Sequence, residues 1–179
     1  MFLVIVQISK RRRQHANENI AGESIVTSRL IMNEGAATLR TFRYHEISEG
    51  QCEFFVYTIA PAVYENFLDA FHDHSPIHVD ETYAQARGFA GRVMHGSILN
   101  GFVSHFIGTW FPGRFSFLLA VDLRYSKPSF LGDVIRLETV VSQKMDAKSI
   151  VVLDATLSNL TQNHLAARGR IQVMVNEEA

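Results

Sequence analysis

The sequence predicts an α+β domain in which one long buried helix packs on a curved antiparallel sheet. Two observations lead to this fold class. Between Gly96 and Trp110, apolar residues recur with helical spacing in the most apolar helical stretch of the chain. From Phe115 onward, apolar and polar residues instead alternate with period two, in short segments separated by turn residues. Because short breaks between successive strands favour antiparallel pairing, the second half of the chain is expected to form the sheet.

The composition is typical of a globular protein with one sizeable core. The chain has 179 residues, of which 47% are apolar and 20% are charged, and its net charge is −1. This length predicts a single domain, and the balanced charge gives no indication of nucleic acid or a membrane surface as a partner. The single cysteine, Cys52, excludes an intramolecular disulfide and indicates a cytoplasmic protein.

Residues 1–43 are expected to be a disordered extension, followed by one domain over residues 44–179. From Gln14 to Glu34 the chain is polar and lacks clear periodicity, so it cannot bury enough apolar surface to become ordered. Phe2 to Ile8 is apolar but too short to span a bilayer. A misassigned start, with Met32 as the true initiator, is an alternative interpretation of this region.

One strand and two helices are expected before the long helix. Gln51 to Ile59 is rich in aromatic and β-branched residues and predicts the strand. Pro61 suits the first turn of a helix that ends near His72, and its apolar face consists of Tyr64, Phe67, Leu68 and Phe71. Ser75 precedes a proline and should be extended, and Asp80 suits the N-cap of a second, short helix.

The long helix is expected to have two different faces. Its apolar face consists of Ile98, Leu99, Phe102, Val103, Phe106, Ile107 and Trp110. A second stripe consists of the small residues Ser97, Gly101, Ser104 and Gly108. A helix with this pattern should be buried, with another part of the structure close to the small stripe. Pro112 and Gly113 end it.

Four segments with period-two alternation predict the strands of the sheet. In each segment, the apolar positions that should share one face are Phe115, Phe117, Leu119, Val121 and Leu123; Ile135, Leu137, Thr139 and Val141; Val151, Leu153, Ala155 and Leu157; and Ile171, Val173 and Val175. Breaks typical of turns separate them, at Pro128, Gly132–Asp133, Asp146–Lys148 and Asn159–Asn163.

The candidate chemistry lies in two short segments, Asp73–His78 and Arg92–Gly96. The first has a carboxylate and an imidazole a few residues apart across Pro76, which suits acid–base work on one water molecule. In the second, Gly96 stands at the start of the long helix, where a free backbone N–H can bind a developing negative charge. Together they indicate addition or removal of water at a carbon–carbon double bond beside a carbonyl.

Each of these residues also has a structural explanation. Asp73 and His78, taken singly, would be an ordinary turn aspartate and a loop histidine, and their pairing with the downstream His95–Gly96 is what favours catalysis. Close packing at a helix start is the structural explanation for Gly96, although the catalytic one is favoured, and a tight helix face is an adequate explanation for Ser104. No metal site is expected from the histidine-rich run at residues 72–78, because no second ligand cluster of suitable spacing follows it.

The segment from about Tyr44 to Val175 resembles the MaoC-like dehydratases, in particular the (R)-specific enoyl-CoA hydratases. Their signature runs Asp-x-Asn-Pro-x-His and is followed, after a loop, by a His-Gly pair that opens the central helix. Asp73, Pro76 and His78 match the first element, and His95–Gly96 matches the second. The resemblance implies the hot-dog fold, an antiparallel β-sheet wrapped around a long central α-helix, in a homodimer or a larger homo-oligomer.

The resemblance also implies a reaction, the reversible hydration of a trans-2-enoyl thioester to the (R)-3-hydroxyacyl thioester. Asp73 and His78 would be catalytic and would hold the water that supplies a hydroxyl to C3 and a proton to C2. The Gly96 N–H would bind the thioester oxygen, and Ser104 would line the active site. Ser75 stands where the family commonly has asparagine; it is shorter but still forms hydrogen bonds.

The resemblance implies no metal or redox cofactor, since the thioester itself activates the double bond. The acyl group would be carried on coenzyme A or on an acyl-carrier protein. Two other functions stay open: thioester hydrolysis on the same fold, and a non-catalytic acyl-binding or assembly subunit. The pairing of Asp73 with His78 favours hydration over both.

Overall fold

The computed structural model of the protein describes residues 38–177. In these residues a five-stranded antiparallel sheet has the strand order β1-β3-β4-β5-β2. The strands are β1 (Cys52–Thr58), β2 (Ser116–Tyr125), β3 (Val134–Met145), β4 (Ile150–Asn159) and β5 (His164–Val175). The successive strands β3, β4 and β5 pair as expected. The expected pairing of β2 with its successor β3 is wrong, because β2 pairs with β5 and forms one edge of the sheet, and β1 forms the other. The predicted α+β class is confirmed.

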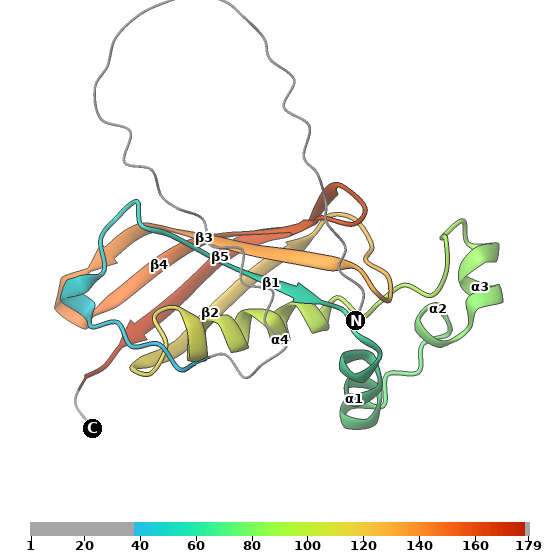
Figure 1. Cartoon of the computed structure of the whole chain (residues 1–179), viewed down its shortest axis with the longest axis horizontal. Coiled ribbons are helices and arrows are strands. Elements are labelled where there is room, and N and C mark those ends of the chain that lie inside the picture. Colours follow the sequence, from blue (N-terminus) through green and yellow to red (C-terminus); the bar gives the residue numbers. More distant parts are fainter. Residues whose placement is uncertain (1–37, 178–179) are drawn as a thin grey trace, which may run out of the picture. The chain divides into compact units, whose positions relative to one another are not determined.

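The long helix lies along one face of this sheet (Figure 1). It consists of α4 (Ser97–His105) and a π-helical continuation, η2 (Phe106–Trp110), so it ends at the expected residue. Three shorter helices lie at one end of the sheet and carry the chain from β1 to α4: α1 (Pro61–Phe71), α2 (Pro76–Val79) and α3 (Glu81–Ala86). The 3-10 turns η1 (Tyr44–Glu46) and η3 (Asp146–Lys148) complete the elements of the described residues.

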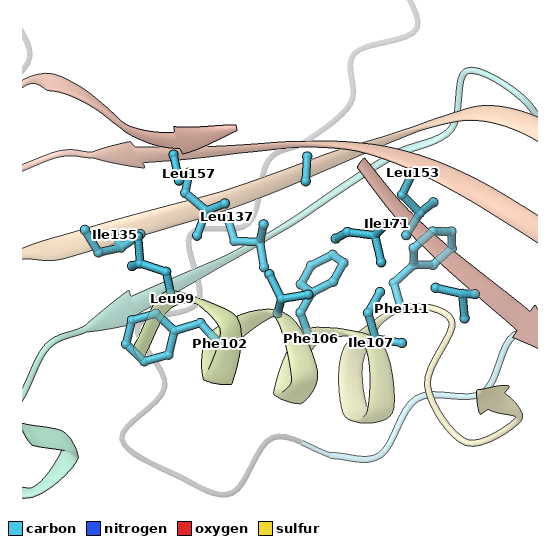
Figure 2. Packing of buried hydrophobic residues seen from close by; sticks show 14 of the residues in the cluster. Leu99, Phe102, Phe106, Ile107, Phe111, Ile135, Leu137, Leu153, Leu157 and Ile171 are labelled. Carbon is cyan, nitrogen blue, oxygen red and sulfur yellow. The ribbon is translucent and has the colours of Figure 1, made fainter. Parts of the chain in front are cut away.

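The core lies between the long helix and the inner face of the sheet, where side chains from both layers point toward one another (Figure 2). Most of the side chains labelled there are at most 4% exposed to solvent, among them Leu99, Phe106, Ile107, Ile135, Leu137, Leu153, Leu157 and Ile171. Burying each such side chain contributes about 1.5–3 kcal/mol. The apolar stripes expected for β3, β4 and β5 are confirmed, and they fix the position of α4 against the sheet.

The alternation expected for β2 is wrong at two positions. Phe117 and Leu119 are 62% and 47% exposed, whereas Phe115, Val121 and Leu123 pack against the core. A register shift between Leu118 and Ala120 explains the difference, because a bulge adds one residue and breaks the period of two. The edge strand β2 therefore exposes large apolar side chains.

The expectation of a close neighbour at the small stripe of α4 is also wrong within the described residues. Gly101 and Gly108 are both exposed. A Cβ atom added at either position would have no atom within 4 Å. Burial of the long helix is thus confirmed on its apolar face only, and its small face is open.

The folded part begins earlier than Tyr44, the boundary expected from the sequence. The Arg40 N–H donates to the Thr109 carbonyl at 2.9 Å, and the Arg40 side chain pairs with Glu53 at 2.9 Å. The Phe42 ring packs edge-on against Phe111, with ring centroids 5.1 Å apart. These residues belong to the domain, because their partners lie on the core elements. Residues 1–37 of the expected extension, including Met32, lie outside the described residues.

None of the helices within residues 38–177 combines the length and the apolar character needed to cross a membrane.

Candidate active site

A tight turn after α1 places the expected catalytic pair. His72 ends α1 in the left-handed region, with φ at 53°. The Asp73 carboxylate then accepts the Ser75 N–H at 3.2 Å, an arrangement that stabilises a local turn. Ser75 is extended, as its position before Pro76 requires, with φ −54° and ψ 132°. The His78 N–H donates back to the Ser75 carbonyl at 2.8 Å and closes the first turn of α2.

The hydrogen bond of His78 defines which of its ring nitrogens is free. Its Nδ1 lies 2.7 Å from the Val93 carbonyl oxygen. A carbonyl only accepts, so Nδ1 carries the hydrogen, and Nε2 of the neutral ring keeps its lone pair. The Tyr64 hydroxyl donates to the His78 carbonyl at 3.0 Å and holds the main chain here. His78 is therefore presented as a proton acceptor through Nε2.

A third residue, His95, joins the pair. One side-chain nitrogen or oxygen from each of Asp73, His78 and His95 lies within 4.8 Å of those from the other two. His95 is 3% exposed, its Nε2 lies 2.9 Å from the Asp73 backbone oxygen, and its ring centroid is 3.9 Å from that of His78. Sequence reasoning used His95 only as a motif residue. The available signal was its place directly before the glycine that opens the most apolar helix.

This cluster has the composition of a divalent metal site, one carboxylate and two imidazoles. It differs from the histidine-rich run considered from the sequence, since the exposed His72 and His74 are not part of it. In the observed geometry one nitrogen of each imidazole already faces a backbone carbonyl. The expectation of no metal stays a prediction.

Gly96 lies at the N-terminus of α4 with an N–H that has no acceptor among the described residues. Two other N–H groups of the first helical turn, at Ile98 and Leu99, donate to the carbonyls of His95 and Gly96. A Cβ atom at Gly96 would lie 3.2–3.3 Å from the Tyr125 ring, tighter than ordinary contact. Both interpretations of Gly96 are therefore compatible with the structure: a side chain there would press on the Tyr125 ring, and the Gly96 N–H is available to a ligand.

Two cavities adjoin this cluster, and they divide the expected site residues. The first has a volume of about 310 Å³ and is lined by His78, His95, Gly96 and Tyr125, among others. The second has a volume of about 660 Å³ and lies between α1 and α4. Asp73 and Ser104 line it, together with the mainly apolar residues Val63, Phe67, Phe71, Ile98 and Phe102. The acid–base pair thus joins a compact cavity at the helix N-terminus to a larger apolar groove.

Ser75 lines neither cavity. Its main chain forms the turn between Asp73 and His78, but its side chain has no hydrogen-bond partner among the described residues. The structure thus brings together four of the five expected site residues around the two cavities and leaves the Ser75 side chain outside.

The chain is similar to several known proteins. A family model described as MaoC like domain matches residues 49–163. The chain is 29% identical to the (R)-specific enoyl-CoA hydratase of Rhodospirillum rubrum over 132 residues, which cover 74% of this chain and 90% of that protein. It is 25% identical to the 3-hydroxybutyryl-CoA dehydratase of Methylorubrum extorquens over 141 residues, 79% of this chain and 90% of that protein.

A solved structure shows the same architecture. The unliganded R-hydratase PhaJ1 from Pseudomonas aeruginosa superposes with a TM-score of 0.72 at 28% identity, covering 78% of this chain and 89% of that one. The antiparallel sheet around α4 is therefore the hot-dog fold that the resemblance implied. The family match covers more than half of the chain and contains Asp73, His78 and Gly96. The chain belongs to the MaoC-like domain family.

Proposed function

We propose that this protein reversibly hydrates a trans-2-enoyl thioester to the (R)-3-hydroxyacyl thioester. The observation that carries the proposal is the joint placement of Asp73 and His78, whose side-chain atoms lie within 4.8 Å, beside the unpartnered N–H of Gly96. The names of two relatives, an (R)-specific enoyl-CoA hydratase and a 3-hydroxybutyryl-CoA dehydratase, support the same reaction with coenzyme A as carrier. An acyl-carrier protein is the alternative carrier.

The chemistry follows from the three groups. The thioester oxygen accepts the Gly96 N–H, and the positive end of the α4 dipole stabilises the charge that develops there. A water held between the Asp73 carboxylate and His78 Nε2 adds its oxygen to C3. The pair takes one proton from this water and returns one to C2. At the end of the cycle both side chains have their starting protonation, and the product contains the whole water molecule.

The two cavities suggest how the substrate lies. The thioester binds at Gly96 in the first cavity, and C3 lies where Asp73 and His78 meet. The alkyl chain beyond C3 then occupies the apolar groove between α1 and α4, where Ser104 lies on the wall. The groove volume of about 660 Å³ is within the range of small-molecule sites. This placement puts the polar end of the substrate on polar groups and the alkyl chain on apolar ones.

The reaction needs no metal or redox cofactor. Conjugation with the thioester carbonyl already makes C3 electrophilic, and a hydrogen bond at the carbonyl oxygen strengthens that effect. We therefore expect the metal-free protein to be fully active, and dialysis against a chelator to leave turnover unchanged.

The proposed assembly is a homodimer, or a larger homo-oligomer, formed along the β2 edge. Phe117, Leu118 and Leu119 are 62%, 39% and 47% exposed on this edge. An edge strand with large exposed apolar residues favours pairing with another chain, and closed two-fold assemblies are the commonest way to cover it. Light scattering at micromolar concentration tests this, and a stable, fully active monomer would contradict it. A cytoplasmic location is proposed from the single cysteine.

The experiment that tests the function follows two signals in one reaction. Crotonyl-CoA, longer trans-2-enoyl-CoAs and an enoyl-carrier protein are each added, and loss of the enoyl absorbance is recorded beside free thiol release. Hydration removes the absorbance without releasing thiol, and the product should be the (R) enantiomer by chiral analysis. Thiol release would instead support a thioesterase, and tight binding without either signal would support an acyl-binding subunit.

A further inference from the structure

His95 contacts both members of the proposed catalytic pair and precedes the proposed oxyanion donor. Its Nε2 faces the Asp73 backbone oxygen at 2.9 Å and lies 3.7 Å from the Asp73 carboxylate. Its ring also packs against His78, at 3.9 Å between centroids, and against Phe67, at 4.6 Å. One buried ring thus connects the carboxylate, the imidazole and the main chain leading to Gly96.

Packing alone does not explain why this ring is an imidazole. Its Nδ1 is buried and has no hydrogen-bond partner among the described residues. Leaving a buried polar atom unpaired is destabilising, so an apolar ring would suit a purely packing role better. What the imidazole adds is a donor at Nε2. The Asp73 oxygen only accepts, so Nε2 must carry the hydrogen.

The turn that carries the Asp73 carboxylate needs a contact that fixes its position. Its side chain is 52% exposed, and its carboxylate is held within the turn by the Ser75 N–H at 3.2 Å. The hydrogen bond from His95 ties the main chain of this exposed turn to the buried start of α4. A shift of about 1 Å in a catalytic group can lower a rate roughly a hundredfold. Loss of this tie should therefore reduce turnover without removing any reacting group.

We propose that His95 is a positioning residue, whose Nε2–H holds Asp73 so that its carboxylate stays beside His78 in the geometry that the bound water requires. This inference rests on the proposed hydratase function. His95 takes no proton in the reaction. Its Nε2–H holds the main chain of Asp73, and this hydrogen bond is the contact on which the proposal depends.

Two variants separate the hydrogen bond from the ring. His95→Phe keeps the flat ring and removes the donor, whereas His95→Gln keeps a donor near the Nε2 position and removes the ring. His95→Phe should lower kcat for crotonyl-CoA roughly ten- to a hundredfold with KM nearly unchanged, and His95→Gln should retain most of the activity. His164→Phe is the matched control, because His164 also has a buried, unpartnered Nδ1 but lines neither cavity; its turnover should stay at the parent value.

A double-mutant cycle shows whether His95 acts through Asp73. In an Asp73→Asn background, His95→Phe should have little further effect on kcat, since there is no carboxylate left to position. If the two losses multiply, or if His95→Phe keeps full kcat, the proposal is wrong. If His95→Phe fails to fold, by circular dichroism and melting temperature, His95→Gln decides: a well-folded His95→Gln protein with a more than tenfold lower kcat also overturns it.

A spectroscopic measurement keeps this test independent of the reaction. A long-range proton–nitrogen NMR spectrum of the parent should show His95 with its hydrogen on Nε2 and His78 with its hydrogen on Nδ1. His95 with its hydrogen on Nδ1 would overturn the hydrogen bond and the inference with it. Absence of hydration by the parent, with the expected spectrum, would instead reject the proposed function and leave the His95 contact standing.

Discussion

A histidine lies next to each end of α4 (Ser97–His105), and the two have different surroundings. At the N-terminal end, His95 is 3% exposed, and beside it the Gly96 N–H is left without an acceptor at the first cavity. At the C-terminal end, His105 is exposed on one side, and its Nδ1 hydrogen-bonds the Tyr57 hydroxyl at 3.0 Å. We call the N-terminal end open, because its free N–H lies at the cavity of the candidate active site. We call the C-terminal end closed, because side chains pack around it.

The closed end is held by aromatic packing. The Tyr57 ring stacks on Phe102 with centroids 4.4 Å apart, and its hydroxyl donates to the Phe102 carbonyl at 3.0 Å. Phe106 and Phe111 are fully buried, and the Phe111 N–H donates to the Phe106 carbonyl at 2.8 Å. The same helix is packed into the core near its C-terminal end and leaves the Gly96 N–H unpaired at its N-terminal end.

The largest effect is expected at the open end, in Asp73→Asn. This change keeps the size of the side chain and removes its ability to accept a proton, so turnover of crotonyl-CoA should fall by about 10²–10⁴-fold. His78→Ala should cause a similar loss, and the double variant should be little worse than the worse single one, because both act on one water. Near-parent turnover in Asp73→Asn, with circular dichroism and oligomeric state unchanged, would falsify the proposed mechanism.

The next effect is expected at the closed end, in Phe106→Ala. Removing this fully buried ring leaves a cavity and should lower the free energy of unfolding by about 3–5 kcal/mol. Urea unfolding measures the loss, and Ile107→Val is a mild control with an expected cost of about 0.5–1.5 kcal/mol. Below its unfolding transition, Phe106→Ala should keep the parent kcat. A large kcat loss without a stability loss would show that the two ends are not separated as described.

A smaller effect is expected from Gly96→Ala, which retains the N–H. The added Cβ would press on the Tyr125 ring at 3.2 Å, and overpacking of this kind costs about 1–3 kcal/mol of stability. Because Tyr125 is 51% exposed, part of the strain can relax, and turnover should fall only about tenfold. Adding Tyr125→Ala should restore both stability and turnover. Failure of that rescue would indicate that the backbone at Gly96, and not the clash, limits the reaction.

Sequence patterns predicted the parts of this comparison that depend on local spacing. The period-two stripes of β3 to β5 follow from alternation along each strand, and the turn from Asp73 to His78 follows from Pro76. The role of His95 could not be predicted, since its partners are a backbone oxygen 22 residues earlier and a ring on another helix. The bulge at Leu119 and the open face at Gly101 likewise depend on which elements pair, and alternation or residue size alone does not show that.

The smallest effect concerns pH and returns to His105 at the closed end. Burial lowers the pKa of its imidazole below the ordinary value, because the charged form is poorly solvated beside the aromatic side chains. The unfolded chain then binds the proton more readily than the folded chain. The contribution of His105 to stability is therefore fully present above about pH 6.5 and is lost as the pH falls below that value toward the folded-state pKa.

The variant His105→Asn tests this, because it keeps a donor for the Tyr57 hydroxyl but does not titrate. Between pH 7.5 and pH 5, its melting temperature should fall less steeply than that of the parent, while kcat at pH 7.5 stays unchanged. An equal fall in melting temperature for the two proteins over this pH range would show that protonation of His105 is not coupled to folding. A steeper fall in the variant would reverse the sign derived from its burial.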